Sequence, residues 1–132
     1  MRVCDLMVGD LVLHDGKVIR VDAVHKRKIG YYKTNDKLTW LFDGQFQPIQ
    51  LTPEILEKNG FRVEHNIGFY ALIGIDDRVE LQNDKEYMNS RNEWYVHIDS
   101  EDYSTIASCE LTYVHELQHI LRLCKIDKEI VV

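Results

Sequence analysis

The feature that most constrains this fold is a hairpin signal near the start of the chain. Residues 11–14 are mainly apolar, Asp15-Gly16 follows, and residues 17–24 alternate apolar and polar side chains. Asp-Gly readily adopts the positive φ angles of a two-residue turn, so the pattern predicts two paired strands. Two more strands are predicted at residues 31–33 and 38–42, around a polar turn. Short strands with tight turns favour a small curled sheet or barrel, like that of Src-homology-3 domains, over about the first 50 residues.

A short helix with both ends marked comes next. Thr52 is a favourable N-cap, and Pro53 suits the first helical position, where no N–H is needed. Gly60 is placed to end the helix in a left-handed conformation. A helix is therefore predicted between Thr52 and Gly60.

The rest of the chain predicts a second antiparallel sheet and a C-terminal helix. Strands are predicted at residues 68–75, 78–81, 94–98, 108–112 and 129–132. A polar loop is predicted at residues 82–92, and an amphipathic helix at residues 113–124. Strands dominate and the helices are segregated, so the predicted class is α+β. A chain of 132 residues fits one compact domain, 1–132, in which two lobes, 1–50 and 51–132, remain an alternative.

Composition bounds the possible partners and compartments. The net charge is −6 and the pI is near 5.4, which argues against a large footprint on nucleic acid or on an anionic membrane. Cys4, Cys109 and Cys124 form no CxxC pair, as is usual for core thiols in a reducing compartment. The N-terminal apolar run is broken by charge at once, and no run approaches the roughly 20 apolar residues of a membrane span. We therefore expect a soluble, cytoplasmic protein.

One string spells out a known chemistry. Residues 115–119 read HELQH, and on a helix this HExxH spacing places two imidazoles on one face with a glutamate beside them. The enzyme hypothesis is a zinc-dependent peptidase, with His115 and His119 as metal ligands and Glu116 as general base. A catalytic zinc needs three protein ligands, however, and the 13 residues after His119 offer two carboxylates, Asp127 and Glu129.

Helix geometry gives a plainer interpretation of the same string. One side of the predicted helix is an apolar stripe, made by Tyr113, Leu117, Ile120, Leu121 and Cys124. The opposite side gathers polar side chains, which are His115, Gln118, His119 and Arg122. The string then marks an amphipathic helix whose exposed face carries two histidines.

Three segments of the chain resemble a family of small uncharacterised proteins found in Bacteroidetes genomes and their phages. They are residues 5–12 (DLMVGDLV), 48–61 (PIQLTPEILEKNGF) and 113–119 (YVHELQH), the last running on to Glu129-Ile130. In that family the closing motif typically reads Tyr-Val-His-Gln-Leu-Gln-Asn, so the counterparts of Glu116 and His119 are amides. The resemblance implies a structural helix and brings no established activity. It favours a non-catalytic accessory or interaction protein of a mobile-element or phage-like locus, with an unknown protein partner and no metal or other cofactor.

A third hypothesis comes from the basic cluster. The cations Lys26, Arg27, Lys28 and Lys33 are interleaved with tyrosines on a predicted hairpin. Such a surface suits a small-barrel nucleic-acid-binding protein, in which phosphates meet cations and bases stack on rings. The plain alternative is a solvated turn, which the overall charge of −6 favours.

Two other features of the sequence could form a site or an interface. The adjacent acids Asp76-Asp77 could form a carboxylate pair, although such pairs more often mark a turn. The large aromatic residues are predicted to lie in the core or on a sheet face, and any exposed subset would mark an interface; they are Trp40, Phe42, Trp94 and Tyr95.

Overall fold

The computed structural model describes residues 2–34, 37–64, 69–71, 79–83, 94–99 and 105–132. The chain divides into two compact units. Unit 1 comprises Met1–Gln50 and Tyr113–Gln118, and unit 2 comprises Leu51–Thr112 and His119–Val132. Each unit therefore contains strands from the middle or start of the chain and part of the C-terminal region.

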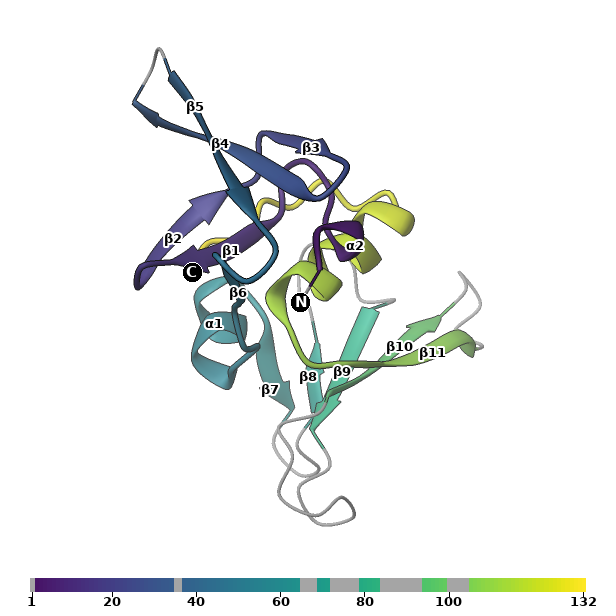
Figure 1. Cartoon of the computed structure of the whole chain (residues 1–132). Coiled ribbons are helices and arrows are strands. Elements are labelled where there is room, and N and C mark those ends of the chain that lie inside the picture. The colour runs from purple at the N-terminus through teal and green to yellow at the C-terminus, as the bar shows by residue number, and fades with distance from the viewer. Residues whose placement is uncertain (1, 35–36, 65–68, 72–78, 84–93, 100–104) are drawn as a thin grey trace. The chain divides into compact units, whose positions relative to one another are not determined.

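Unit 1 is built from two antiparallel sheets of three short strands each (Figure 1). The first has the order β2-β1-β6, from β1 (Leu11–His14), β2 (Lys17–Arg20) and β6 (Gln47–Pro48). The second has the order β3-β4-β5, from β3 (Ala23–His25), β4 (Lys28–Thr34) and β5 (Lys37–Phe42). A 3₁₀ turn, η1 (Val3–Asp5), precedes them. The predicted first hairpin is confirmed, because Asp15 and Gly16 join β1 to β2 with φ angles of 50° and 74°.

Backbone hydrogen bonds at the β2–β3 bend connect the two sheets of unit 1. Val21 N donates to Asp10 O at 2.8 Å, and Asp22 N donates to Gly30 O at 2.8 Å. The sheets share a core of eight side chains, Val3, Leu6, Val12, Val21, Ile29, Tyr31, Leu41 and Phe46. The predicted α+β class is confirmed, but among the described strands the pairing leaves two open sheets and does not close a barrel.

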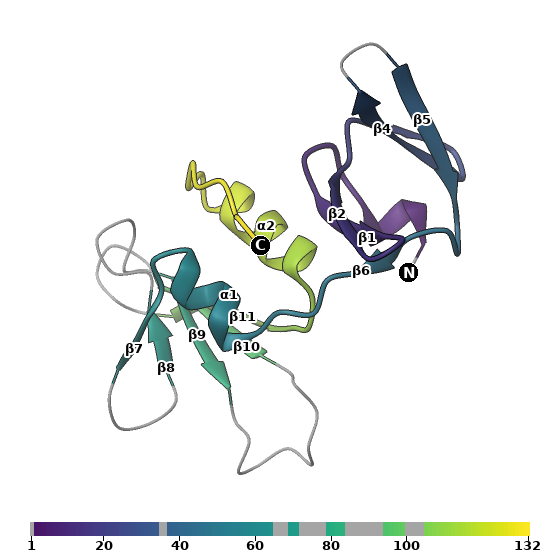
Figure 2. The same ribbon diagram turned by 90° about the vertical axis from the view of Figure 1, so that its left-hand side faces the viewer.

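Unit 2 contains a five-stranded antiparallel sheet with the order β11-β10-β9-β8-β7. Strands β7, β8 and β9 lie side by side in Figure 2. The strand bounds are β7 (Arg62–Glu64), β8 (Phe69–Ala71), β9 (Val79–Asn83), β10 (Trp94–Asp99) and β11 (Thr105–Leu111). The predicted strand 94–98 is confirmed, whereas most of the predicted loop 82–92 and of the strand 68–75 lies outside the described residues.

The helix α1 (Pro53–Lys58) begins and ends as its sequence predicts. Thr52 Oγ1 accepts the N–H of Ile55 at 3.3 Å, so this threonine is the N-cap. Gly60 has a φ of 87°, and its N–H donates to Glu57 O while the N–H of Phe61 donates to Leu56 O. This pair of bonds is the Schellman motif, for which a glycine suits the left-handed position.

The helix α2 (Val114–Leu123) also ends in a Schellman motif, with Lys125 in the left-handed position at a φ of 57°. The N–H of Ile126 donates to Leu121 O at 2.9 Å, and both of these side chains are buried. None of the described helices is long and apolar enough to cross a membrane.

The segment after α2 is held by a side chain and not by a strand. Asn59 is 1% exposed; its Nδ2 donates to Val131 O at 2.7 Å and its Oδ1 accepts from Val131 N at 2.8 Å. The prediction of a final strand at 129–132 is therefore wrong. The backbone N–H and C=O of Val131 bond to the side-chain amide of Asn59, and not to the backbone of a neighbouring strand.

Candidate functional site

The glutamate of the HELQH string is the cap of its own helix. Helix α2 starts at Val114, and Glu116 Oε1 accepts the backbone N–H of Tyr113 at 3.0 Å. This is the glutamate half of a capping box, in which a residue in the first turn bonds back to the N-cap. A carboxylate in the first turn also interacts favourably with the helix dipole. Glu116 therefore has a structural role that does not require a metal.

The two histidines of the string have different surroundings. His115 is 4% exposed, and its ring stacks on that of Tyr113, with centroids 5.8 Å apart and planes inclined by 11°. His119 is half-buried. The prediction that both histidines lie on an exposed polar face is wrong, because the side of the helix that carries His115 is buried.

Gln118 gives the physical reason for this burial. Its side chain is 8% exposed; Nε2 donates to Gly9 O at 3.0 Å, and Oε1 accepts the N–H of Leu11 at 2.9 Å. The amide thus bonds to the start of β1 as a neighbouring peptide would. The part of the polar side that carries His115 and Gln118 is therefore a docking side within unit 1, whereas Arg122 of the same helix is exposed.

A metal site at the string requires a further ligand. Asp127 and Glu129 are exposed in the segment that follows α2. Among the residues that the structure describes, no three His, Cys, Asp or Glu side chains are grouped so as to hold a metal ion. A catalytic zinc requires three protein ligands, and the described part of the chain places no third ligand beside the two histidines of the string.

Replacing Glu116 separates the capping role from the catalytic role. Glu116→Ala should lower the free energy of unfolding by about 1 kcal/mol, because the Tyr113 N–H loses its acceptor. Glu116→Gln should stay within a few tenths of a kcal/mol of the wild type, roughly the value for a cap that keeps an oxygen acceptor. Urea denaturation followed by circular dichroism measures both. Stoichiometric zinc in the purified protein that is lost in His119→Ala would contradict the capping interpretation.

The basic cluster is divided between a turn and a strand. Lys26 and Arg27 form the β3–β4 turn, and Lys26 has a φ of 52°. Lys28 begins β4, whereas Lys33 lies at its far end, beside an irregularity in the β4–β5 pairing. Five residues of extended chain separate Lys28 from Lys33 by about 16 Å, so the predicted four cations do not form one compact patch.

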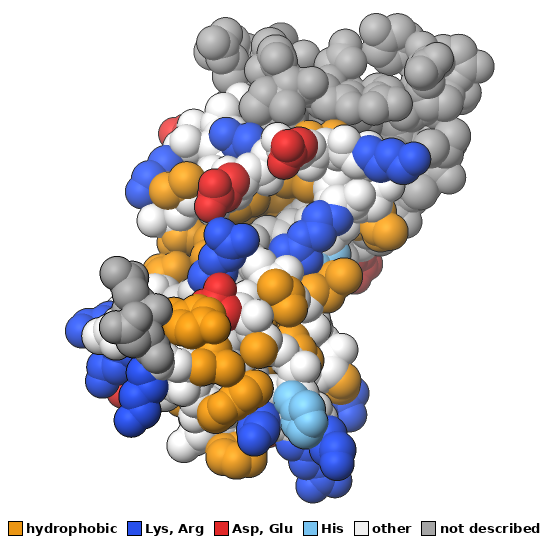
Figure 3. Space-filling model, turned by 90° about the horizontal axis from the view of Figure 1, so that it is seen from above, with side chains coloured by type: hydrophobic (Ala, Val, Ile, Leu, Met, Phe, Trp, Pro, Cys, Tyr) orange, Lys and Arg blue, Asp and Glu red, His pale blue; other side chains and the backbone are white. Residues whose placement is uncertain are grey.

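Three exposed aromatic side chains share one face of the β3-β4-β5 sheet. Lys28 pairs with Phe42, Gly30 with Trp40, and Tyr32 with Leu38, so all six side-chain positions point to the same side. The exposed fractions are 57% for Tyr32, 37% for Trp40 and 56% for Phe42. We call this surface, with Lys28 and with His25 of β3, the aromatic face. In Figure 3 hydrophobic and basic side chains and a histidine lie next to one another on the surface of this part of the chain.

Trp40 is the centre of the aromatic face. Lys28 Nζ lies 4.5 Å from the centroid of its ring, within the range of a cation–π interaction. The His25 ring meets Trp40 edge-on, with centroids 6.4 Å apart and an interplanar angle of 70°. A Cβ on Gly30 would lie 3.0 Å from Cγ of Leu38, so Leu38 leans across the glycine. Lys28, His25 and Trp40 therefore form one contiguous group on this face.

The opposite face of the same sheet supplies core residues. Tyr31, which sequence reasoning placed beside the basic cluster, is 7% exposed and belongs to the core of unit 1. Of the two adjacent tyrosines only Tyr32 is exposed. Sequence reasoning left open whether Trp40 and Phe42 lie in the core or on a sheet face, and strand alternation places both on the side of Tyr32 once the hairpin register is known.

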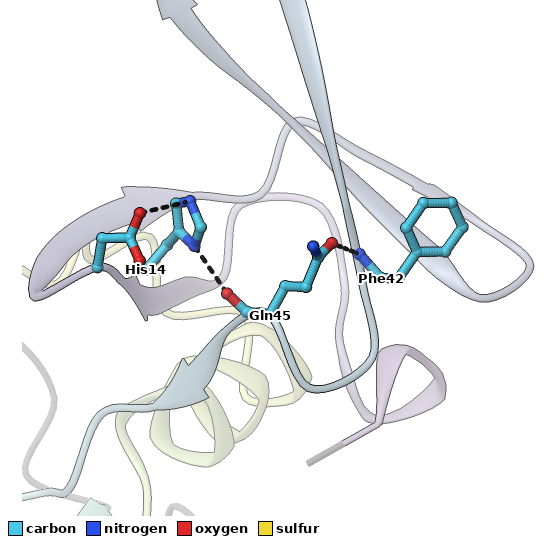
Figure 4. Close-up of polar contacts among 4 residues, drawn as sticks. His14, Phe42 and Gln45 are labelled. Atoms are coloured by element: carbon cyan, nitrogen blue, oxygen red, sulfur yellow. Dashed lines mark hydrogen bonds and ion pairs between the residues drawn. The ribbon is translucent and has the colours of Figure 1, made fainter.

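A shallow pocket of about 550 Å³ opens between two turns of unit 1. Its lining residues are Leu13, His14, Asp15, Gly16, Gly44, Gln45, Phe46 and Gln47. His14 Nδ1 lies 2.7 Å from Gln45 O, and Nε2 lies 3.3 Å from Asp15 Oδ2 (Figure 4). Gln45 Oε1 in turn accepts the N–H of Phe42 at 2.8 Å. These contacts fix the end of β5, and with it the position of Phe42 on the aromatic face.

The other predicted features contribute no site. Asp76-Asp77 lies outside the described residues. Cys4 is exposed, so the prediction that it is a core thiol is wrong, and Cys124 is half-buried. Cys109 lies on β11. Trp94, predicted to lie in the core or on a sheet face, is fully buried.

The candidate sites therefore differ in what they offer. The helix that carries HELQH uses Glu116 and Gln118 for structure, whereas the aromatic face presents exposed rings and cations. Comparisons with protein-family models, with curated proteins and with solved structures found no match to this chain.

Proposed function

We propose that this protein is a non-catalytic binding module whose working surface is the aromatic face. The observation that carries the proposal is the set of three exposed rings on two paired strands, with Lys28 and His25 against Trp40. Exposed contiguous apolar surface rimmed by polar groups marks interaction sites in soluble proteins. Aromatic side chains are also enriched where protein partners bind.

The distribution of charge supports this choice of surface. Residues 1–50 carry eight Lys and Arg against six Asp, a balance of +2, whereas the remaining 82 carry eight against 16 Asp and Glu, a balance of −8. The overall charge of −6 therefore hides a mildly basic N-terminal part that contains the whole aromatic face. Electrostatic attraction of an acidic partner would be confined to that part.

The non-catalytic half of the proposal is supported by the roles of the HELQH residues. Glu116 caps α2, and Gln118 joins the helix to β1. The resemblance to small proteins of Bacteroidetes genomes and phages supports an accessory role in a mobile-element or phage-like locus.

Site-specific photo-crosslinking in native cells tests the working surface. A benzoylphenylalanine at position 42 should give discrete adducts, because this position lies on the aromatic face and is 56% exposed. Position 18, on β2 of the other sheet and 44% exposed, is the matched control and should give few. Mass analysis shows whether the adduct is protein or nucleic acid. Equal labelling from positions 42 and 18 would contradict the proposal.

A further inference from the structure

We infer that the aromatic face binds single-stranded nucleic acid through base stacking and phosphate contacts. This inference rests on the proposed function, because it assigns a partner class to the same surface. It requires three things of the face: rings spaced along a track, cations beside that track, and carboxylates engaged elsewhere.

The rings occupy three successive levels along the strands. Phe42 lies opposite Lys28, Trp40 opposite Gly30, and Tyr32 opposite Leu38. Each level is two residues from the next, which corresponds to about 6.7 Å, so the track extends over about 13 Å. Successive bases of an extended single strand can each meet one ring on such a track.

The cations lie beside the end of the track where Phe42 is found. Lys28 pairs across the sheet with Phe42 and reaches the ring of Trp40, and His25 pairs with Lys28 on the other side. Lys26 and Arg27 follow in the adjoining turn. A backbone that runs along the rings therefore has positive groups within reach of its phosphates.

Two carboxylates near the aromatic face, among the residues that the structure describes, are engaged with backbone donors. Asp22 Oδ2 accepts the N–H of Tyr32 at 3.1 Å, and Asp43 Oδ1 accepts the N–H of Val3 at 2.8 Å. Hydrogen bonds to a carboxylate hold it in place and offset part of its charge. The local balance on the aromatic face thus favours a polyanion.

Single-stranded nucleic acid fits this surface better than duplex nucleic acid or an acidic peptide does. In a duplex the base faces are stacked on one another, so exposed rings would have nothing to stack on. An acidic peptide would use the cations but would leave three flat rings without planar partners. Gly30 contributes no side chain of its own beside Trp40, and Leu38 covers that position, so a base would meet the ring of Trp40 and the apolar side chain of Leu38 there.

Fluorescence anisotropy with labelled oligothymidylate and oligouridylate of about 15 nucleotides tests the inference, a length near the upper site sizes of small β folds. Tyr32→Ala and Phe42→Ala should each weaken binding about 5- to 150-fold, the range measured for loss of one base-stacking ring. Val18→Ala removes an apolar side chain of the other sheet that is 44% exposed, and it should leave the Kd unchanged. The two oligonucleotides distinguish DNA from RNA as the preferred strand.

Intrinsic fluorescence gives a second readout on the folded wild-type protein. Of the two tryptophans, Trp94 is fully buried and Trp40 is exposed, so a base stacked on the aromatic face should quench the emission of Trp40. Trp40→Phe should keep most of the affinity while the quenching disappears, because phenylalanine still offers a ring. Binding of the oligonucleotide to the wild-type protein with no quenching of its emission would overturn the stacking role of Trp40.

Salt dependence tests the phosphate contacts. A plot of log K against log salt concentration has a negative slope. Its magnitude should decrease by about 0.7 in Lys28→Ala, the value for one single-strand phosphate contact. Lys17→Ala, an exposed lysine on β2, is the matched control and should leave the slope unchanged.

Several outcomes would overturn the inference. These are no binding of either oligonucleotide at low salt, duplex binding as tight as single-strand binding, or displacement by polyglutamate as effective as displacement by oligothymidylate. A protein adduct at position 42 together with no oligonucleotide binding would overturn this inference and leave the proposed function standing. The lack of both signals would remove both.

Discussion

Replacing Asn59 by aspartate is expected to lower the free energy of unfolding by about 3 kcal/mol or more. The side chain is 1% exposed, and its Nδ2 donates at 2.7 Å both to Ile55 O and to Val131 O. Aspartate keeps the oxygen that accepts from Val131 N but sets a second oxygen against two carbonyls. A buried carboxylate loses its hydration, and here its second oxygen would also be repelled by the two carbonyl oxygens.

Urea denaturation followed by circular dichroism measures this effect. Asn59→Ala should lower the free energy of unfolding by about 2 kcal/mol, which is less than the effect of aspartate, because it leaves the Val131 groups unsatisfied without adding a charge. Glu57→Ala, at an exposed position of the same helix, is the control and should stay within about 0.5 kcal/mol of the wild type. An aspartate variant as stable as the control would show that Asn59 does not hold the segment after α2.

Replacing Trp94 by alanine should destabilise the protein by about 3–5 kcal/mol. The side chain is fully buried on β10, and Nε1 donates to Leu51 O at 3.1 Å. Leu51 N in turn donates to Thr112 O, so the indole supports the segment between β6 and α1. Alanine leaves a cavity and also an unsatisfied carbonyl.

Trp40 provides a matched control for this prediction, because it is the second tryptophan of the chain and is exposed. Trp40→Ala should cost less than Trp94→Ala, because its side chain is 37% exposed and the cation–π contact that it loses contributes about 1 kcal/mol at such a site. Trp94→Phe retains most of the ring and isolates the hydrogen bond to Leu51. Thermal and urea unfolding compare the three variants, and equal losses at positions 94 and 40 would contradict the assigned exposures.

Features encoded by adjacent residues were predictable from the sequence. Asp15-Gly16 supplies the positive φ angles of its turn, and Thr52, Pro53 and Gly60 mark the ends of α1. Each depends on residues within one helical turn or one hairpin loop. Local chemistry therefore determines these elements whatever surrounds them.

Features that depend on distant partners were not predictable. Helical periodicity assigned Gln118 and His115 to a solvent face, yet Gln118 bonds to Gly9, 109 residues away. A run of apolar residues suggested a strand at 129–132, but Asn59, 72 residues from Val131, takes the backbone groups there. A side-chain amide that replaces a peptide leaves no periodic pattern in the sequence.

The candidate site was predictable in part. The sequence indicated the hairpin and its basic turn, and strand alternation already separates Tyr32 from Tyr31. The exposure of Trp40 and Phe42 depends on which face of the sheet receives the core, and that is decided by packing against Val3, Leu6 and Val12. Large aromatic residues are buried more often than exposed, so the residue types alone favour burial of Trp40 and Phe42.

The bond between Gln118 and the start of β1 also has a kinetic consequence. Leu11 and Gln118 are 107 residues apart in the sequence. During synthesis, residues 9–11 are therefore added to the chain more than a hundred residues before Gln118. At bacterial and eukaryotic synthesis rates this interval lasts about 5–20 seconds, and closing so long a loop costs about 4 kcal/mol of chain entropy. The nascent N-terminal sheet therefore waits for its last partner, and its completion is a late step of folding.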